Sequence, residues 1–202
     1  MKIDTPVLLI AFNKVDTTKR VLDQLTKFNI RNVHFSIDGA RNDKEEKTVR
    51  QVKSIICEYK HLSHEHLNIE SENLGCRKHV IKAITNFFKQ HPSGIILEDD
   101  TLPSESFFEF CSFLLKRYEE DKSIWHIGGY KPPIIDDTPY AYTYTKATHV
   151  WGWATWADRW EKYIEILTDD EINEINNFNY FDSKFKTKRR VKQLKAVNTK
   201  KV

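Results

Sequence analysis

The sequence has only three cysteines in 202 residues, at Cys57, Cys76 and Cys111. An odd number without metal-site spacing argues against a disulfide framework and against a structural zinc site, so the cysteines are expected to be reduced, as in a cytoplasmic protein. Long apolar runs are also missing: segments such as Val7–Phe12 are far shorter than the roughly 20 residues that a membrane-spanning helix needs. The first residues carry charges and no apolar stretch, so no secretory signal is predicted.

Three motifs that would define a familiar site are absent. No G-x-G-x-x-G follows the first apolar segment, and no G-x-x-x-x-G-K-[ST] occurs anywhere, which argues against a Rossmann dinucleotide site and against a P-loop. No G-x-S-x-G occurs either, which argues against a serine hydrolase with a strand–turn–helix nucleophile. Any catalytic site must therefore be built from other residues.

The net charge of +3 conceals an asymmetry along the chain. Residues 184–202 hold nine Lys or Arg and no Asp or Glu, so the rest of the chain is acidic on balance. An acidic body is not suited to polyanions, and no nucleic-acid partner is expected. We predict one domain over residues 1–168 and a polar to basic tail over 169–202. The tail is expected to be a solvated, disordered or weakly helical end, and the alternative is peripheral contact with an anionic membrane.

The pattern of apolar residues predicts an α/β fold. With 40% hydrophobic and 12% aromatic residues, the chain can bury a core. Short apolar segments at residues 6–12, 33–37 and 94–97 are typical of buried strands, and they alternate with helical patterns. This alternation predicts a mostly parallel central sheet flanked by helices. Residues 140–145 alternate with period two, which predicts an antiparallel strand late in the chain.

Three consecutive acids, Glu98, Asp99 and Asp100, come directly after the third of these apolar segments. In open α/β sheets, ligands bind outside the carboxyl ends of the strands, where these side chains are expected. Adjacent carboxylates repel one another, and a hard divalent cation such as Mg²⁺ or Mn²⁺ relieves that repulsion. The sequence thus predicts a metal site, with a solvated acidic turn as the alternative.

Other polar residues are predicted to lie at the same edge of the sheet. Asn13 and Lys14 follow the first strand, Asp38 follows the second, and Arg77 lies in a turn that enters a helix. Cations beside a metal-binding carboxylate cluster suit a diphosphate ligand. The alternatives are that Lys14 and Arg77 are surface charges and that Asp38 is a turn residue before Gly39.

Four of the five tryptophans fall between residues 151 and 160. Indole rings at this density either build a core or line a ligand surface, since aromatic faces stack on sugars and the indole N–H binds hydroxyl groups. Gly152 lies between Trp151 and Trp153, which suggests that the backbone needs unusual room there and favours a site loop.

Six stretches, taken together, resemble a known family. They are PVLLIAFNK, SIDGAR, ENLGCRKHV, IILEDDTLPSESFFEFC, SIWHIGGY and HVWGWATW, in this order over residues 5–163. They resemble the GT-A nucleotide-diphospho-sugar glycosyltransferases, above all the bacterial family-2-like branch that includes proteins named haemolysin-like. The chain is also similar, more distantly, to the N-acetylglucosaminyltransferase I of eukaryotes. The resemblance implies a GT-A fold, which is Rossmann-like.

The resemblance also implies roles for particular residues. Glu98, Asp99 and Asp100 stand where the family has its DXD-like motif, so Asp100 would bind Mn²⁺ or Mg²⁺ while Asp99 and Glu98 contact the ribose and the donor sugar. The remaining positions implied are Ala11, Phe12, Asn13 and Lys14 in the turn that holds the nucleotide, Asp38 at the base, Arg77 at the nucleotide or diphosphate, and Trp151, Gly152 and Trp153 in the loop that closes the donor–acceptor cavity.

The implied reaction is a direct displacement that inverts the anomeric carbon of a nucleotide-diphosphate sugar, with UDP expected as the nucleotide. The acceptor would be a glycan or a lipid-linked glycan in polysaccharide synthesis, and the enzyme is expected in the cytoplasm, or at the inner membrane face if the basic tail contacts lipid. The metal and the cations would stabilise the leaving diphosphate, and a carboxylate would take the proton of the acceptor hydroxyl. Asp158, Asp169 and Asp170 are the candidate bases, the last two favoured by spacing; each is alternatively a surface acid or a helix cap.

Two other hypotheses stay open. The resemblance ends after Tyr163, so the chain is alternatively a truncated, non-catalytic protein that binds nucleotide sugar or a partner. A nucleotidyltransferase is a third reading, because sugar-activating enzymes have related folds. It is disfavoured because the glycine-rich, basic first loop expected of such an enzyme is missing.

Overall fold

The structure is a computed structural model that describes residues 3–62, 66–130, 140–146, 148–164, 167–177, 187–189, 191–192 and 195. The chain divides into two compact units. The first comprises Met1–Ile134 and His149–Glu161, and the second comprises Ile135–Thr148 and Lys162–Val202. The sequence analysis placed a single boundary after residue 168. In the structure the first unit ends at Glu161, and an internal segment groups with the second unit.

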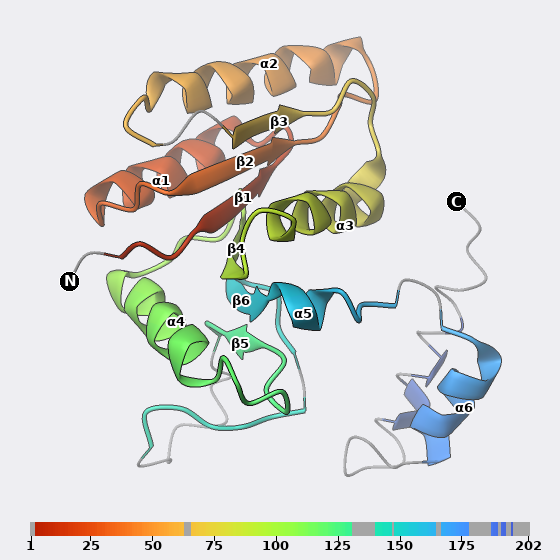
Figure 1. The fold of residues 1–202 in the computed structure, drawn as a ribbon. Helices are drawn as coiled ribbons and strands as arrows, with labels where there is room; N and C mark the ends of the chain where they lie inside the picture. The colour runs from red at the N-terminus through yellow and green to blue at the C-terminus, as the bar shows by residue number, and fades with distance from the viewer. Residues whose placement is uncertain are drawn as a thin grey trace. The chain divides into compact units, whose positions relative to one another are not determined.

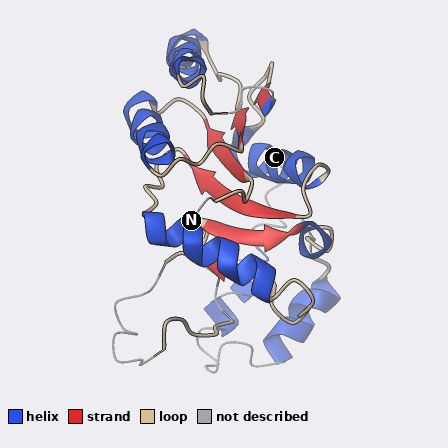
Figure 2. Cartoon of the chain, turned by 60° about the vertical axis from the view of Figure 1, so that its left-hand side comes forward, coloured by secondary structure: helices blue, strands red, loops and turns tan. Residues whose placement is uncertain are grey.

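The first unit is an α/β sandwich around one sheet (Figure 1). Its elements are β1 (Val7–Ala11), α1 (Val15–Lys27), β2 (Val33–Ile37), α2 (Asp43–Glu58), β3 (Leu67–Ile69), α3 (Gly75–Phe88), β4 (Ser93–Glu98), α4 (Glu105–Arg117), β5 (Ile127–Gly128), β6 (Trp153–Trp156) and α5 (Ala157–Trp160). The strand order is β3-β2-β1-β4-β6-β5, and helices lie on both sides of the strands (Figure 2). The predicted α/β class is confirmed, and the architecture is consistent with a Rossmann-like fold.

The four strands β3, β2, β1 and β4 are parallel, as expected from their continuous apolar runs. Every residue of β1 and β2 is buried. On one face, α3 covers the sheet with a core cluster that contains Leu8, Ile10, Ala83, Ile84, Phe87, Phe88 and Ile96. The apolar positions of α1 are also buried where the sequence predicts them, at Val21, Leu22 and Leu25. The core thus holds the ends of β1, β2 and β4 at fixed positions.

The late antiparallel strand lies elsewhere than predicted. Described residues 140–146 contain no strand, so the prediction from the alternation of residues 140–145 is wrong. Instead β6 pairs with β4 in antiparallel register, with Ile96 opposite Trp153, and β5 pairs with β6. The physical reason is that β6 completes the open edge of β4 and buries Ala154 and Trp156 there, a gain that local periodicity does not reveal.

In the second unit, helix α6 (Asp169–Asn177) begins after Thr168, whose hydroxyl accepts a hydrogen bond from the amide of Glu171 at 3.2 Å. The carboxylate of Glu171 in turn accepts from the amide of Thr168 at 2.7 Å, which completes a capping box. Ile172, in this helix, is fully buried.

Cys57, Cys76 and Cys111 are all free thiols, and Cys111 is buried in α4, where burial raises the pKa of its thiol. Within the described ranges, no helix combines the length and the apolar character that crossing a membrane requires.

Replacing Gly39 should destabilise the fold, because this residue lies against the main chain of the segment before α3. A Cβ at Gly39 would overlap the carbonyl group of Glu72 and lie 2.7 Å from the amide nitrogen of Asn73. We expect Gly39→Ala to lower the free energy of unfolding by about 2 kcal/mol or more, measured by urea denaturation. The control is Gly128→Ala, whose Cβ would meet its nearest neighbour at 3.5 Å. Equal stability of the two variants would contradict this account.

Candidate active site at the carboxyl edge of the sheet

The acidic triplet lies beside the turn that follows β1. In the parallel register of β1 and β4, Ile10 is opposite Glu98, so the two strands end at the same level. The last residue of β1, Ala11, accepts a hydrogen bond at its carbonyl from the amide of Asp38, which follows β2. Three strand ends therefore meet at one edge of the sheet, as the sequence predicts.

Asp99 and Asp100 have different environments although they are neighbours in sequence. Asp99 is only 5% exposed, and its Oδ2 accepts a hydrogen bond from the amide of Phe12 at 3.0 Å. Asp100 has half of its side chain exposed. The ammonium of Lys14 contacts both carboxylates, at 3.3 Å from Oδ1 of Asp99 and 2.6 Å from Oδ2 of Asp100. Lys14 thus joins the turn after β1 to the turn after β4.

The other two residues of the first turn are also held by neighbours. The amide nitrogen of the Asn13 side chain donates to Glu45 in α2 at 3.4 Å, and the guanidinium of Arg41 lies 5.5 Å from the ring centre of Phe12. The predicted nucleotide-binding turn is therefore a fixed structure in which main-chain and side-chain groups are already positioned.

The carboxylates of the triplet are held at an electrostatic cost. Burial, together with the charges of Asp100 and Asp99, raises the pKa of Glu98. Burial also raises the pKa of Asp99, although the Phe12 amide and Lys14 oppose that shift. The hydrogen bond to Asp100 raises the pKa of Lys14 and keeps its ammonium charged. The negative charge of the triplet is only partly neutralised by Lys14, and this excess favours a cationic ligand.

Asp38 fastens the second strand to the start of α3. Its Oδ1 accepts hydrogen bonds from the amides of Gly39 and Leu74, both at 2.9 Å. Its Oδ2 accepts from the amide of Gly75 and from the side-chain amide of Asn73, both at 3.1 Å. The carboxylate is buried and serves as a structural acceptor for this loop. Its predicted contact with a nucleotide base stays a prediction.

The first turn of α3 lies near the acidic triplet. Burial raises the pKa of the Cys76 thiol, and the charges of Glu98 and Asp38 raise it further, so this turn is close to both acids. The turn contains no acidic residue of its own, and the carboxylate of Asp38 faces its amino end by accepting from the amides of Leu74 and Gly75. Arg77 is the third residue of α3 and half-buried. Its approach to a diphosphate stays a prediction.

The tryptophan loop lies beside the triplet. Gly152 has a φ of +74°, in the left-handed region, and a Cβ there would lie 3.3 Å from the methyl group of Thr101, the residue after Asp100. Its neighbour Trp151 is 63% exposed and packs edge-on against Tyr130, with ring centres 4.9 Å apart. His149 lies beside both rings. These aromatic side chains form an open surface next to the triplet.

Trp153 has a different role from Trp151. Its ring stacks on His126 with centres 4.9 Å apart, and it packs against the core cluster beneath α3. Trp156 is buried, and its indole nitrogen donates to the carbonyl of Leu115 at 3.1 Å. Trp153 and Trp156 therefore pack in the core, which was the alternative to a ligand surface. Trp151 instead faces solvent.

Of the candidate bases, Asp158 lies away from the triplet. Asp158 follows Trp156, which pairs with Ser93 at the beginning of β4, so Asp158 lies at the opposite end of the strands. It forms ion pairs with Lys122 at 2.9 Å and Arg159 at 2.8 Å. Asp169 and Asp170 open α6 in the second unit, and their role as bases stays a prediction.

Sequence reasoning missed three residues of this edge. Thr101, Tyr130 and His149 contact or flank the tryptophan loop, but none has a residue type that signals a site by itself. The paired glycines Gly128 and Gly129 were the available signal, because the amide of Gly129 donates to the carbonyl of Gly152 at 2.9 Å and so brings the segment after β5 to the loop.

The residues present suit a divalent cation that is shared with a ligand. In the part of the chain that the structure describes, no three His, Cys, Asp or Glu side chains are placed to hold a metal by themselves. Mg²⁺ and Mn²⁺ commonly use one or two carboxylates, and phosphates and water supply the other oxygens. The oxygens of Asp100 fit that chemistry, and Oδ2 of this carboxylate already pairs with the ammonium of Lys14 at 2.6 Å.

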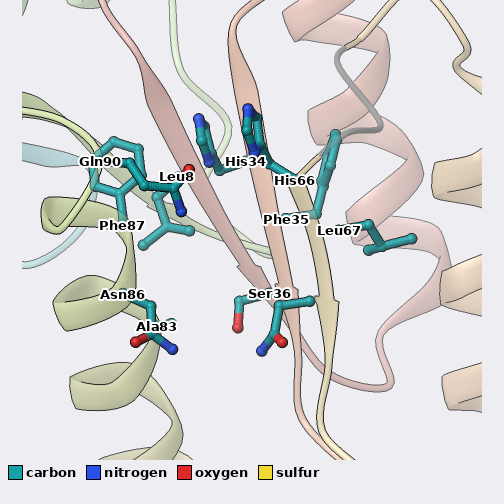
Figure 3. A pocket seen from close by; sticks show the side chains of 11 residues that line it. Leu8, His34, Phe35, Ser36, His66, Leu67, Ala83, Asn86, Phe87 and Gln90 are labelled. Carbon is teal, nitrogen blue, oxygen red and sulfur yellow. The ribbon is translucent and has the colours of Figure 1, made fainter.

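A separate pocket of about 230 Å³ lies between α3 and the strands β2 and β3 (Figure 3). His34 and His66 stack there with ring centres 4.0 Å apart, and Nε2 of His91 lies 2.6 Å from Nε2 of His34. Burial and the two other imidazoles lower the pKa of His34 to about 3, so this ring is neutral. His34 is opposite Leu8, toward the amino ends of the strands, and the pocket is therefore distinct from the acidic edge.

Comparison with known proteins assigns no family. No protein-family model matches the chain, and no curated protein matches it. The geometry of the acidic edge and the motifs of the sequence are therefore what supports a function for this chain.

The raised pKa of Glu98 leads to a prediction about stability. The folded protein holds this proton more tightly than the unfolded chain, so the resulting stabilisation is present below the ordinary pKa of Glu and is lost as the pH rises through the folded-state pKa. Glu98→Gln should thus match the wild type near about pH 4 and be the more stable protein near about pH 7. Urea denaturation at both pH values measures this difference.

The control for this prediction is Glu109→Gln, on the exposed side of α4. It should show no comparable divergence between the two pH values. If Glu98→Gln were less stable than the wild type at neutral pH, the ionised carboxylate would be making a net favourable contribution and our electrostatic account would be wrong.

Proposed function

We propose that this chain is a metal-dependent glycosyltransferase of the GT-A fold, which moves a sugar from a UDP-sugar to a glycan or lipid-linked acceptor. One observation carries the proposal. At the carboxyl edge of a mostly parallel sheet, a buried Asp99 anchors an exposed Asp100 beside Lys14. This edge is where open α/β sheets bind ligands, and its charge pattern suits a diphosphate with a divalent cation. The order of the surrounding motifs supports the same assignment.

The residues of the edge have distinct tasks in this proposal. The turn Phe12–Lys14 receives the nucleotide, and Asp38 keeps the start of α3 in position beside it. Arg77, the third residue of α3, attracts the negative charge of the diphosphate. Glu98 and Asp99 lie next to the donor ribose and sugar.

Asp100 would hold Mn²⁺ or Mg²⁺ together with the diphosphate. The ion supplies positive charge that stabilises the leaving nucleoside diphosphate. Because Asp99 is fixed by the Phe12 amide, the backbone of the triplet is preorganised and Asp100 needs little rearrangement to bind a cation.

The aromatic surface of Tyr130, His149 and Trp151 would receive the acceptor. Aromatic rings stack on the apolar faces of sugars, and the phenol, imidazole and indole groups bind hydroxyl groups. The surface adjoins Thr101 and hence the metal-binding turn, so an acceptor there would lie close to the donor. Attack by the acceptor hydroxyl would invert the anomeric carbon, with Asp169 or Asp170 as the proposed base.

A second candidate function is a nucleotide-sugar-binding protein without transferase activity. The position of Asp158 favours it, because this acid lies at the opposite end of the strands and is paired with Lys122 and Arg159. Donor binding without transfer or hydrolysis, across a broad panel of acceptors, would support this alternative.

The proposed donor site predicts that UDP binding depends on a divalent cation and on Asp100. In calorimetric titration with Mn²⁺, Asp100→Asn should bind UDP about tenfold more weakly than the wild type, since it loses the charge that holds the cation. In EDTA the two proteins should bind UDP equally weakly. Asp121→Asn, in the connection after α4, is the matched control and should behave as the wild type.

Equal binding of UDP by Asp100→Asn and wild type in Mn²⁺ would contradict a metal-dependent site at the triplet. Binding that is independent of both the metal and Asp100 would favour a different ligand position. Absence of UDP binding in every condition would direct the same titration to GDP and CMP.

The acceptor surface predicts a separate effect for Trp151→Ala. Glycans retained by the wild type on an array, with UDP and Mn²⁺ present, should bind the variant about three- to tenfold more weakly, because one exposed stacking surface is lost. The affinity for UDP should change little. Trp125→Ala removes an exposed indole near the beginning of β4, where the Trp125 carbonyl accepts from Thr155, and serves as the control. Equal loss in both variants would place the glycan elsewhere.

A further inference from the structure

The contact between Lys14 and Asp100 places a cation of the protein at the atom that a divalent cation would use. The ammonium lies 2.6 Å from Oδ2 of Asp100, in a hydrogen-bonded ion pair. Both side chains are about half exposed, so the contact can open without breaking the core. A metal that binds Asp100 must therefore compete with Lys14.

Lys14 and a divalent cation cannot both stay at this oxygen. Two positive groups within 3–4 Å of each other repel strongly, more so beside a partly buried site than in bulk water. The lysine side chain is flexible and carries a compact charge, so it can move away while its backbone stays in the turn.

Lys14 has a second carboxylate, that of Asp99, within reach of its ammonium. Its ammonium already contacts Oδ1 of Asp99 at 3.3 Å, and Asp99 is fixed from its other oxygen by the amide of Phe12. An ammonium that leaves Asp100 therefore keeps a buried carboxylate as a partner. A diphosphate at the same edge would add a second anionic partner.

We propose that Lys14 is an exchangeable cation that makes metal binding depend on the diphosphate. In the ligand-free protein the ammonium neutralises Asp100 and keeps the affinity for divalent cations low. When a nucleoside diphosphate binds, the ammonium turns from Asp100 to the phosphate oxygens, and the divalent cation takes its place. This inference rests on the proposed function, which supplies the diphosphate. The binding of the metal and the binding of the nucleotide are then coupled. Each ligand increases the affinity of the protein for the other by the same factor.

The test measures Mn²⁺ binding to the full chain without nucleotide, by calorimetry or by the electron paramagnetic resonance of free Mn²⁺. Lys14→Met removes the competing charge and should bind Mn²⁺ about tenfold more tightly than the wild type. Lys14→Arg keeps the charge and should stay close to the wild type. Lys19→Met, which removes an exposed lysine paired with Asp23 on α1, is the matched control and should change nothing.

A second measurement repeats the Mn²⁺ titrations in saturating UDP. The ratio of Mn²⁺ dissociation constants without and with UDP should be large for the wild type and should fall about tenfold in Lys14→Met. If that variant fails to give the circular dichroism spectrum of the wild type, Lys14→Gln replaces it.

The outcomes separate this inference from the proposed function. Unchanged or weaker Mn²⁺ binding by a folded Lys14→Met, without UDP, overturns the exchange even if the wild type binds UDP with metal. Tighter binding by Lys14→Met supports the exchange even if UDP itself fails to bind, in which case the proposed donor is wrong. If neither protein binds Mn²⁺, Lys14 is not what keeps the metal out, and the exchange is overturned.

Discussion

The buried carboxylate of Asp99 determines the geometry of the acidic edge. A carboxylate removed from water must be paired, and Asp99 is paired with the amide of Phe12 and the ammonium of Lys14. Both partners come from the turn after β1, so this one side chain joins two turns that are far apart in sequence. Asp100 is exposed as a result of that anchoring, and its position next to Lys14 follows from where Asp99 is held.

Asp38 fixes the loop after β2 by accepting hydrogen bonds, as Asp99 fixes the turn after β4. It accepts four hydrogen bonds from the loop around it and fixes the residues that open α3. Two buried acids thus position the residues that open α3 and the exposed Asp100. Asp38 and Asp99 are buried and accept hydrogen bonds from main-chain amides of nearby loops, whereas Asp100 pairs with Lys14 at the surface, so acids of the same type differ in exposure.

The buried strands were predictable because their signal is local. Continuous apolar runs correctly indicated β1, β2 and β4, and the parallel arrangement then placed the acids at one edge. The strand β6 was missed, and a strand at residues 140–145 was wrongly predicted, because pairing with β4 depends on residues nearly 60 positions earlier in the chain. The sequence alone also did not predict the different roles of Asp99 and Asp100 or those of Trp151 and Trp153. Burial distinguishes them, and burial is set by the assembled fold.

The electrostatics of the edge favour a binding site over a solvated acidic turn. In a solvated turn, repulsion among three carboxylates is weakened by water and salt, and burial adds no further penalty. Here burial and mutual repulsion raise the pKa of Glu98, and burial raises that of Asp99, so ionising them at neutral pH costs stability. In the described structure, the ammonium of Lys14 offsets part of this repulsion, and half of the Lys14 side chain is exposed. A cation brought by a ligand would relieve the remaining repulsion, which gives the unfavourable arrangement a functional reason that the fold alone does not provide.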